Sequence, residues 1–158
     1  MNFGHIIVPL DGSELAECVL PYIESVISNT NVSTVELVRV VPHLEMHYKA
    51  AFPLDANQEK QMNTVAIKEA EDYLQMVKSK LDTSRMTVIT KVLTGHVAET
   101  IASYIEKSSA GLLLTATHGR SGPSRWAMGS TAQKMVEISC VPVLMVRPPS
   151  CRPKIKQI

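Results

Sequence analysis

The sequence has almost no excess charge of either sign, and its cysteines form no paired motif. Its 16 lysines and arginines nearly balance 15 aspartates and glutamates, which leaves a formal net charge of +1. A protein that holds nucleic acid by general electrostatics needs a basic face, so we expect no nucleic-acid partner. Three cysteines without a Cys-x-x-Cys pair predict neither a disulfide framework nor a zinc site. We expect Cys18 and Cys140, which lie among apolar residues, to be small buried hydrophobes.

Long apolar runs are also missing. No run approaches the roughly 20 residues that span a bilayer, so we expect no membrane partner. Residues 1–12 lack the basic start and long apolar stretch of a secretory signal peptide, and the simplest location is the cytoplasm. The 158 residues contain no internal repeat and no linker. That length suits one domain with a hydrophobic core of its own.

Short apolar runs alternate with amphipathic stretches along the chain. Apolar runs, several rich in β-branched residues, predict strands at 5–10, 35–41, 86–93, 112–114 and 142–146. Apolar residues at helical spacing predict helices at 15–26, 66–81, 97–105 and 132–139, with Pro21 placed to bend the first. This strict alternation predicts an α/β fold with a mostly parallel sheet covered by helices on both faces.

Three loops follow the strands that would border a binding site. In doubly wound sheets a ligand lies beyond the carboxyl ends of the strands, where the strand order reverses. The first two loops begin at Asp11-Gly12 and at Val41-Pro42, and the third is the segment 116–134, "ATHGRSGPSRWAMGSTAQK". Residues 42–58 contain two prolines and no clear period, and we predict a long loop there.

The segment 116–134 resembles a phosphate loop but fits neither of two common templates. A dinucleotide loop needs G-x-G-x-x-G after the first strand, and that turn reads "PLDGSE" here. A Walker loop needs G-x-x-x-x-G-K-[ST], and Gly129 is followed by Ser130 and Thr131 without a lysine. Fast phosphoryl transfer by that machinery is therefore not expected.

The physical chemistry of this segment still favours an anion. We expect Gly119 to leave the strand with a positive φ and to bring backbone N–H groups close to a ligand. The residues 129–131 open the fourth helix, where unpaired N–H groups and the helix dipole suit a phosphate. Arg120 and Arg125 supply charge nearby. The alternative is an ordinary strand-to-helix loop with Ser130 as the N-cap.

Three segments resemble the universal stress protein family. The opening "HIIVPLDGSELAE" (5–17) is similar to the start of that family, and "SCVPVLMVRP" (139–148) is similar to its end. Between them, "ATHGRSGPSRWAMGS" (116–130) fits the nucleotide motif of the family, G-x-x-G, nine residues, then G-[ST]. The resemblance covers about residues 4–148. It implies an α/β domain related to adenine-nucleotide-binding domains.

The resemblance assigns roles to particular residues. It implies that Asp11 lies beside the nucleotide, near ribose or a metal, although Asp11 to Glu14 also resembles a capping box. It implies that the backbone of Val40 contacts and recognises the edge of the adenine base. His118 has no nucleophilic partner nearby, and we interpret it as a loop residue. The nucleotide-binding residues that we predict are Pro9, Leu10, Asp11, Val40, Ala116, His118, Gly119, Arg120, Ser121, Gly129, Ser130 and Thr131.

Two further expectations follow from the family pattern. The first glycine of the motif is Ala116 here, which costs little if its φ is negative and strains the loop if its φ is positive. The last strand is continuous and apolar, and an apolar sheet edge invites pairing with another chain. Family members commonly dimerise through this strand. We therefore predict a homodimer through Val143, Leu144, Met145 and Val146.

Together these observations predict one doubly wound domain at 1–148 and a flexible tail at 149–158. The five strands are expected in the order 3-2-1-4-5, with two helices on each face. The predicted function is that of a regulatory dimer that binds ATP, or AMP or ADP, with Mg²⁺ brought by the nucleotide and with an unidentified protein partner. The alternatives are a slow ATPase or adenylyl-transfer enzyme, and a nucleotide-free interaction module that uses the 42–58 loop.

Overall fold

A computed structural model describes residues 3–42, 56–119 and 128–151 of the chain. Its sheet has the order β3-β2-β1-β4-β5, and each neighbouring pair of strands is parallel. This confirms the predicted α/β fold and the predicted strand order. The strands are β1 (His5–Pro9), β2 (Thr34–Val41), β3 (Thr87–Thr94), β4 (Leu112–Ala116) and β5 (Val143–Val146).

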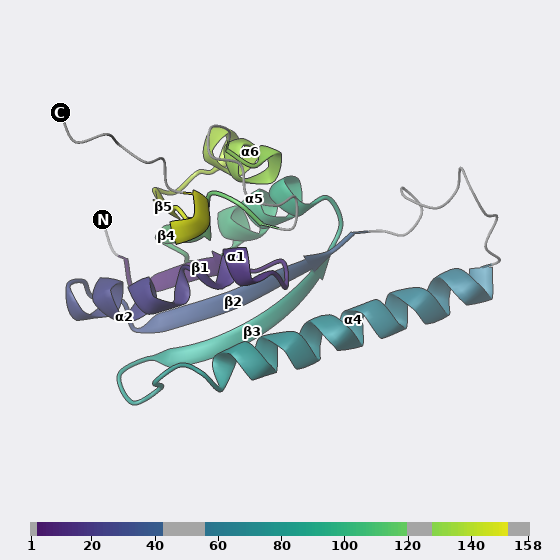
Figure 1. Cartoon of the computed structure of the whole chain (residues 1–158), viewed down its shortest axis with the longest axis horizontal. Helices are drawn as coiled ribbons and strands as arrows, with labels where there is room; N and C mark the ends of the chain where they lie inside the picture. The colour runs from purple at the N-terminus through teal and green to yellow at the C-terminus, as the bar shows by residue number, and fades with distance from the viewer. Residues whose placement is uncertain (1–2, 43–55, 120–127, 152–158) are drawn as a thin grey trace.

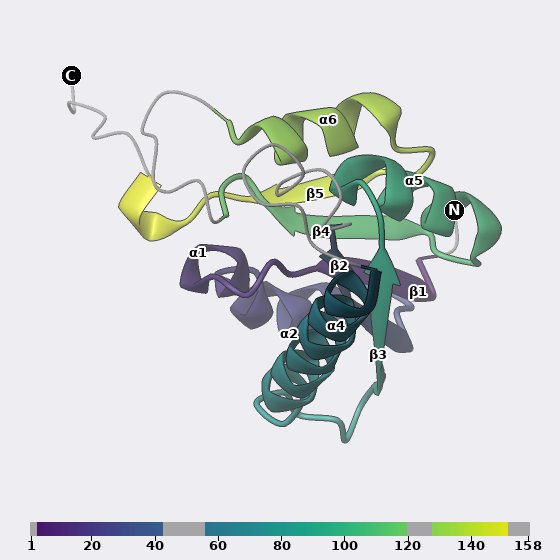
Figure 2. The same ribbon diagram turned by 90° about the vertical axis from the view of Figure 1, so that its right-hand side faces the viewer.

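Helices cover both faces of the sheet (Figures 1 and 2). One face carries α1 (Glu14–Glu17), α2 (Leu20–Ser28) and α4 (Ala56–Lys78), and the other carries α5 (Val97–Lys107) and α6 (Ser130–Ile138). The first predicted helix is thus two helices, because the chain turns at Cys18 and Val19. Pro21 lies in the first turn of α2, where its missing N–H breaks no helical bond. No helix of the described segments is both long and apolar enough to cross a membrane.

Alternating side chains of the strands build a core on each face of the sheet. Ile6 and Val8 of β1 pack toward α1, α2 and α4, while Ile7 packs toward α5 and α6. Every residue of β4 is buried, which agrees with the absence of alternation in that run. The central strands are therefore held from both faces, and their carboxyl ends form a rigid edge for the loops that follow.

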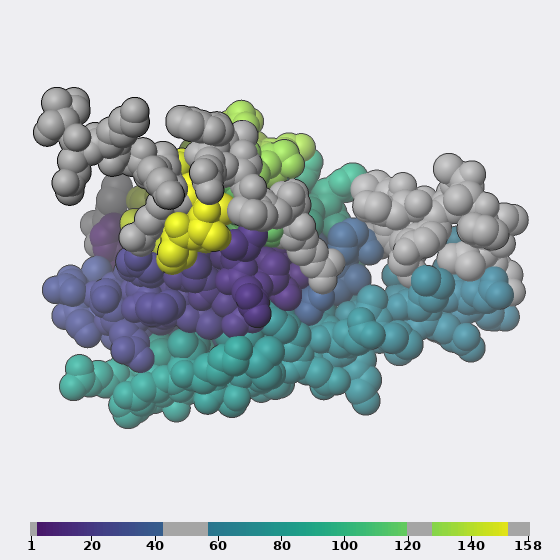
Figure 3. Space-filling view, in the orientation of Figure 1, coloured from purple at the N-terminus to yellow at the C-terminus, as the bar shows by residue number. Residues whose placement is uncertain are grey.

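Helix α4 is longer than its hydrophobic pattern indicates. It begins at Ala56 and has 23 residues, so the predicted 42–58 loop is wrong for residues 56–58. Residues 43–55 lie outside the described part of the chain. At 1.5 Å per residue α4 is about 35 Å long, whereas an eight-residue strand spans about 26 Å. The helix therefore extends past the sheet, as the ribbon and the space-filling view both show (Figures 1 and 3).

The cysteines and the C-terminal segment differ in part from expectation. Cys18 packs partly buried against the core, but Cys140 is exposed because it lies in the turn between α6 and β5. The segment predicted as a tail begins with a 3-10 turn, Pro149–Cys151, in which Cys151 is fully buried. Cys151 thus packs into the domain, whereas Pro149 and Ser150 are exposed. The boundary at residue 148 stays a prediction.

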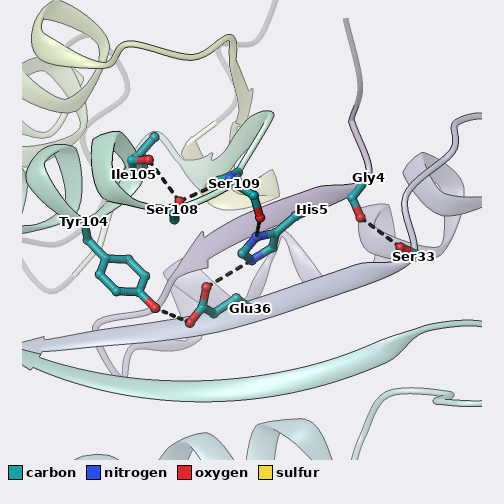
Figure 4. A network of polar contacts seen from close by, with 9 residues as sticks. Gly4, His5, Ser33, Glu36, Tyr104, Ile105, Ser108 and Ser109 are labelled. Atoms are coloured by element: carbon teal, nitrogen blue, oxygen red, sulfur yellow. Dashed lines mark hydrogen bonds and ion pairs between the residues drawn. The ribbon is translucent and has the colours of Figure 1, made fainter.

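A buried polar network lies at the amino ends of the strands, away from the predicted site (Figure 4). Glu36 on β2 is only 3% exposed. The hydroxyl of Tyr104 on α5 donates to Glu36 Oε1 at 2.7 Å, and His5 Nε2 lies 3.0 Å from Glu36 Oε2. Ser109 Oγ lies 3.5 Å from the other ring nitrogen of His5. Both carboxyl oxygens of a buried acid are therefore satisfied, and α5 is tied to the sheet.

We expect Tyr104→Phe to lower the free energy of unfolding by about 1–3 kcal/mol, because it leaves a buried carboxyl oxygen without its donor. Burial, with Glu36 adding to it, raises the pKa of Tyr104 to about 12 from an ordinary value of 10.0. The folded state thus favours the protonated phenol, so this stability is complete below pH 10 and is lost as the pH rises through 12. Urea unfolding of both proteins across this range checks both points. Equal stability at pH 7 would contradict the first, and equal alkaline slopes the second.

Candidate functional site

A cavity of about 570 Å³ lies beyond the carboxyl ends of β1, β2 and β4. It is bounded by the β1–α1 turn, the segment after β4, the start of α6, and residues of α4 and α5. This is the reversal point of the strand order, since β1 pairs with β2 on one side and with β4 on the other. The predicted residues that line it are Pro9, Leu10, Asp11, Val40, Ala116, His118, Gly119, Gly129, Ser130 and Thr131. Arg120 and Ser121 lie outside the described residues.

The turn after β1 is organised by the carboxylate of Asp11. Its Oδ1 accepts a hydrogen bond from the backbone N–H of Ser13 at 2.9 Å and one from the hydroxyl of Ser13 at 2.6 Å. Ser13 Oγ in turn accepts from Ala16 N at 3.2 Å and caps α1. The N-cap is therefore Ser13, and the capping-box interpretation of Asp11 is wrong. Asp11 instead holds the N-cap residue from two positions earlier in the chain, and its second oxygen, Oδ2, faces Gly119.

Gly119 meets that second oxygen. A Cβ built on Gly119 would lie 2.1 Å from Asp11 Oδ2, which is far inside van der Waals contact. The positive φ predicted for this residue is wrong, because among the described glycines only Gly12 and Gly95 have one. A side chain at 119 would force the Asp11 carboxylate or the loop to move, and glycine permits their close approach. The loops after β1 and β4 thus touch at the mouth of the cavity.

The start of α6 is tied to the sheet through Thr117. Gly129 N donates to Thr117 O at 2.9 Å, and Thr117 N donates to Val146 O at 2.9 Å. Gly129 is the N-cap of α6 and makes no side-chain cap bond, so the alternative of Ser130 as N-cap is wrong. Ser130 and Thr131 are the first two helical residues and both line the cavity. Backbone N–H groups of this turn are therefore presented where an anion would be stabilised.

Ala116 occupies the position of the first motif glycine without strain. It is the last residue of β4, pairs with Val146, and is 7% exposed. No non-glycine residue of the described segments has a positive φ, so the backbone of Ala116 tolerates its methyl group. Ala116 lines the cavity and also belongs to the core on the α1 and α2 face of the sheet.

The structure adds lining residues that sequence patterns missed. Arg39 on β2 and Glu69 on α4 line the cavity, as does Thr117 after β4. Arg39 had a visible signal, because it is a charge within the apolar run "TVELVRVV". Glu69 had none, since it is one of several polar residues of α4. His118 is only 3% exposed and its Nδ1 lies 2.8 Å from Thr117 Oγ1, so it is more buried than a loop residue is expected to be.

Charge at the cavity is mixed. Asp11 and Glu69 contribute carboxylates, and Arg39 is the one lysine or arginine among the described lining residues. Within the described residues, no three His, Cys, Asp or Glu side chains gather in a way that would hold a metal ion. An anionic ligand in this cavity therefore meets backbone N–H groups at α6, carboxylates at Asp11 and Glu69, and a guanidinium at Arg39.

Comparison with known proteins agrees with this architecture. The model of the universal stress protein family matches residues 2–147. The chain belongs to the universal stress protein family. Among curated members of the family, Universal stress protein MJ0531 of Methanocaldococcus jannaschii is 25% identical over 149 residues, which cover 93% of this chain and 84% of that protein.

Solved universal stress proteins share the fold. The structure of UspA from Lactobacillus plantarum has a TM-score of 0.77 at 20% identity, over 93% of this chain and 99% of that one. A family protein from Arabidopsis thaliana with AMP bound has a TM-score of 0.63 at 13% identity, over 91% of both chains. A universal stress protein in complex with cAMP has a TM-score of 0.58 at 16% identity, over 94% and 99%.

Proposed function

We propose that this universal stress protein binds an adenine nucleotide, ATP or else AMP or ADP, in the cavity beyond β1, β2 and β4. The observation that carries the proposal is the meeting of two loops there: Gly119 approaches Asp11, and the uncapped start of α6 lines the same space. Structures of the same fold with AMP and with cAMP bound support an adenine nucleotide as the ligand.

The lining suggests how the nucleotide would lie. The phosphates would face the first turn of α6, where Ser130 and Thr131 add hydroxyl donors to the backbone N–H groups. The ribose would lie near Asp11, and the base would lie along the end of β2 near Val40. Mg²⁺ would arrive with the triphosphate, and the Asp11 carboxylate is the side chain placed to approach it.

The function that we favour is regulatory: the state of the protein would depend on whether its site holds a nucleotide. The sequence has no Walker lysine after Gly129, so the usual cation for the β- and γ-phosphates is missing. A ligand that binds only the folded state stabilises it by mass action. The fraction of the protein with nucleotide bound then follows the nucleotide concentration. Slow hydrolysis of ATP is the second candidate, and it would depend on Asp11, the side chain proposed to approach the Mg²⁺ of the triphosphate.

We further propose that the protein is a cytoplasmic homodimer. β5 lies at one edge of the sheet and its outer edge has no strand partner within the described chain. Leu144, in the middle of β5, is 41% exposed. An apolar edge of this kind is stabilised when a second copy covers it.

The nucleotide proposal predicts a thermal shift and a retained ligand. At a ligand concentration of 100 times the dissociation constant, Mg-ATP or AMP is expected to add about 2.7 kcal/mol to the free energy of unfolding. Differential scanning fluorimetry of dialysed protein measures this, with Mg-ATP and AMP tested against Mg²⁺ alone. Native mass spectrometry of gently purified protein should detect an adenine nucleotide. Protein that gives no shift and retains no nucleotide would leave the interaction module as the better interpretation.

A further inference from the structure

Arg39 lies in the cavity wall but outside every segment of the family motif. Among the described lining residues, Asp11 and Glu69 carry carboxylates, and Arg39 carries the one guanidinium group. We propose that Arg39 is a specificity-determining residue that binds a phosphate oxygen of the nucleotide and makes the site prefer phosphorylated ligands to nucleosides. This inference rests on the proposed nucleotide function and adds to it the residue that recognises the phosphate.

The guanidinium of Arg39 reaches from β2 to the turn after β1. A Cβ built on Gly12 would lie 3.2 Å from Arg39 Nη2 and 3.3 Å from its Cζ and Nη1. Gly12 also has a φ of +89, so the turn both requires a glycine and leaves room for the arginine. Gly12 follows Asp11 directly, and Gly119 touches the other side of Asp11. Arg39 therefore lies at the turn that presents Asp11, which Gly119 of the proposed nucleotide-binding segment approaches.

Contacts behind Arg39 hold it in place. Its Cζ lies 4.9 Å from the centroid of the Tyr73 ring, a cation–π distance. The hydroxyl of Tyr73 donates to Glu17 Oε1 at 3.1 Å, and Lys80 Nζ donates to Glu17 Oε2 at 3.0 Å. Contacts from Arg39 through Tyr73 to Glu17 thus connect β2, α4 and α1. A guanidinium oriented before the ligand arrives loses less conformational freedom on binding.

Electrostatics explain why this position needs a cation. A phosphate that extends from a ribose near Asp11 would face like charge, and charges interact more strongly at a partly enclosed site than in bulk water. Arg39 offsets the acidic lining there. Its planar fork of donors matches the oxygens of a phosphate, which a nucleoside lacks. The expected contribution of Arg39 is therefore specific to the phosphorylated form of the ligand.

Calorimetric titration with AMP and with adenosine tests the proposal. Arg39→Gln is expected to weaken AMP about 10- to 100-fold, the range of a charge-assisted hydrogen bond, and to change adenosine affinity less than about threefold. Arg39→Lys keeps the charge without the fork, so its loss of AMP affinity should be intermediate. Lys91→Gln is the matched control, because it removes one cation from the exposed outer part of β3. It should leave both affinities unchanged.

Tyr73 provides a second, independent pair of variants. Tyr73→Phe keeps the ring beneath the guanidinium, whereas Tyr73→Leu removes it. The leucine variant should lower the AMP-to-adenosine preference more than the phenylalanine variant does. Should Arg39→Gln fail to fold, Arg39→Lys and this pair decide the matter. Equal losses of AMP and adenosine affinity, or an unchanged AMP affinity, would overturn the role of Arg39. A wild-type protein that binds no adenine nucleotide would instead overturn the proposed function itself.

Discussion

Gly119→Ala is expected to lower the free energy of unfolding by about 1–3 kcal/mol and to weaken nucleotide binding about 10- to 100-fold. The added methyl carbon would stand 2.1 Å from Asp11 Oδ2. The carboxylate cannot simply turn away, because its other oxygen holds both the N–H and the hydroxyl of Ser13. Relief of the clash therefore disturbs the cap of α1, the loop after β4, or both. Urea unfolding and calorimetric titration with AMP measure the two effects.

A double-mutant cycle with Asp11→Ala isolates the cause. Without the carboxylate, the methyl group at 119 has space, so the stability cost of Gly119→Ala should fall by about 1 kcal/mol or more in that background. The same cost in both backgrounds would mean that glycine at 119 is needed for another reason. The cycle uses stability as its readout, so it remains informative whichever ligand the cavity binds.

Leu144→Lys is expected to convert the proposed dimer into a monomer at micromolar concentration. In a two-fold symmetric contact through β5 the substitution removes an apolar side chain from each copy and brings two like charges together. Loss of two buried leucines, at about 1.5–3 kcal/mol each, corresponds to a dissociation constant at least about a hundredfold higher. Analytical ultracentrifugation across a concentration series measures it.

The opposite sheet edge supplies a matched control. Ile89 on β3 is 39% exposed, close to the 41% of Leu144, and β3 is the other edge strand. Ile89→Lys therefore introduces the same charge at a comparable position and should leave the assembly unchanged. A wild-type protein that sediments as a monomer would exclude the dimer. Dissociation by Ile89→Lys alone would move the interface to β3.

Much of the fold could be predicted because its signals are local. The β-branched runs at β1, β2 and β5 and the unbroken "LLL" of β4 indicate strands by themselves, and strict alternation with helices leaves few topologies. The start of α4 could not be predicted in this way. Its first residues, "ANQEKQ", carry no hydrophobic stripe, because that part of the helix extends past the sheet. A hydrophobic stripe appears in the sequence only where a helix packs against the sheet. The helical turns that extend past the sheet have no such stripe.

The candidate site likewise has residues that the sequence could indicate and others that it could not. The spacing of Gly119 and Gly129 was visible in the motif, and the structure places both at one cavity. The reason for Gly119 was not visible, because it depends on Asp11, a residue distant in sequence. Arg39 was missed for a related reason: side-chain direction at a strand end is set by the turn and the helix that flank it, here Gly12 and Tyr73. Cys140 was misjudged because apolar neighbours in sequence do not ensure burial in a turn.

The two hydrogen bonds of Thr117 have a consequence for signalling. Its carbonyl holds the first residue of the anion-binding turn, and its N–H holds the last residue of the strand proposed to dimerise. One peptide segment therefore belongs to both the nucleotide site and the assembly edge. Any movement there is subject to thermodynamic reciprocity: the factor by which ligand strengthens or weakens association equals the factor by which association changes ligand affinity. The extent of dimerisation and the occupancy of the nucleotide site would then be coupled through the backbone of Thr117.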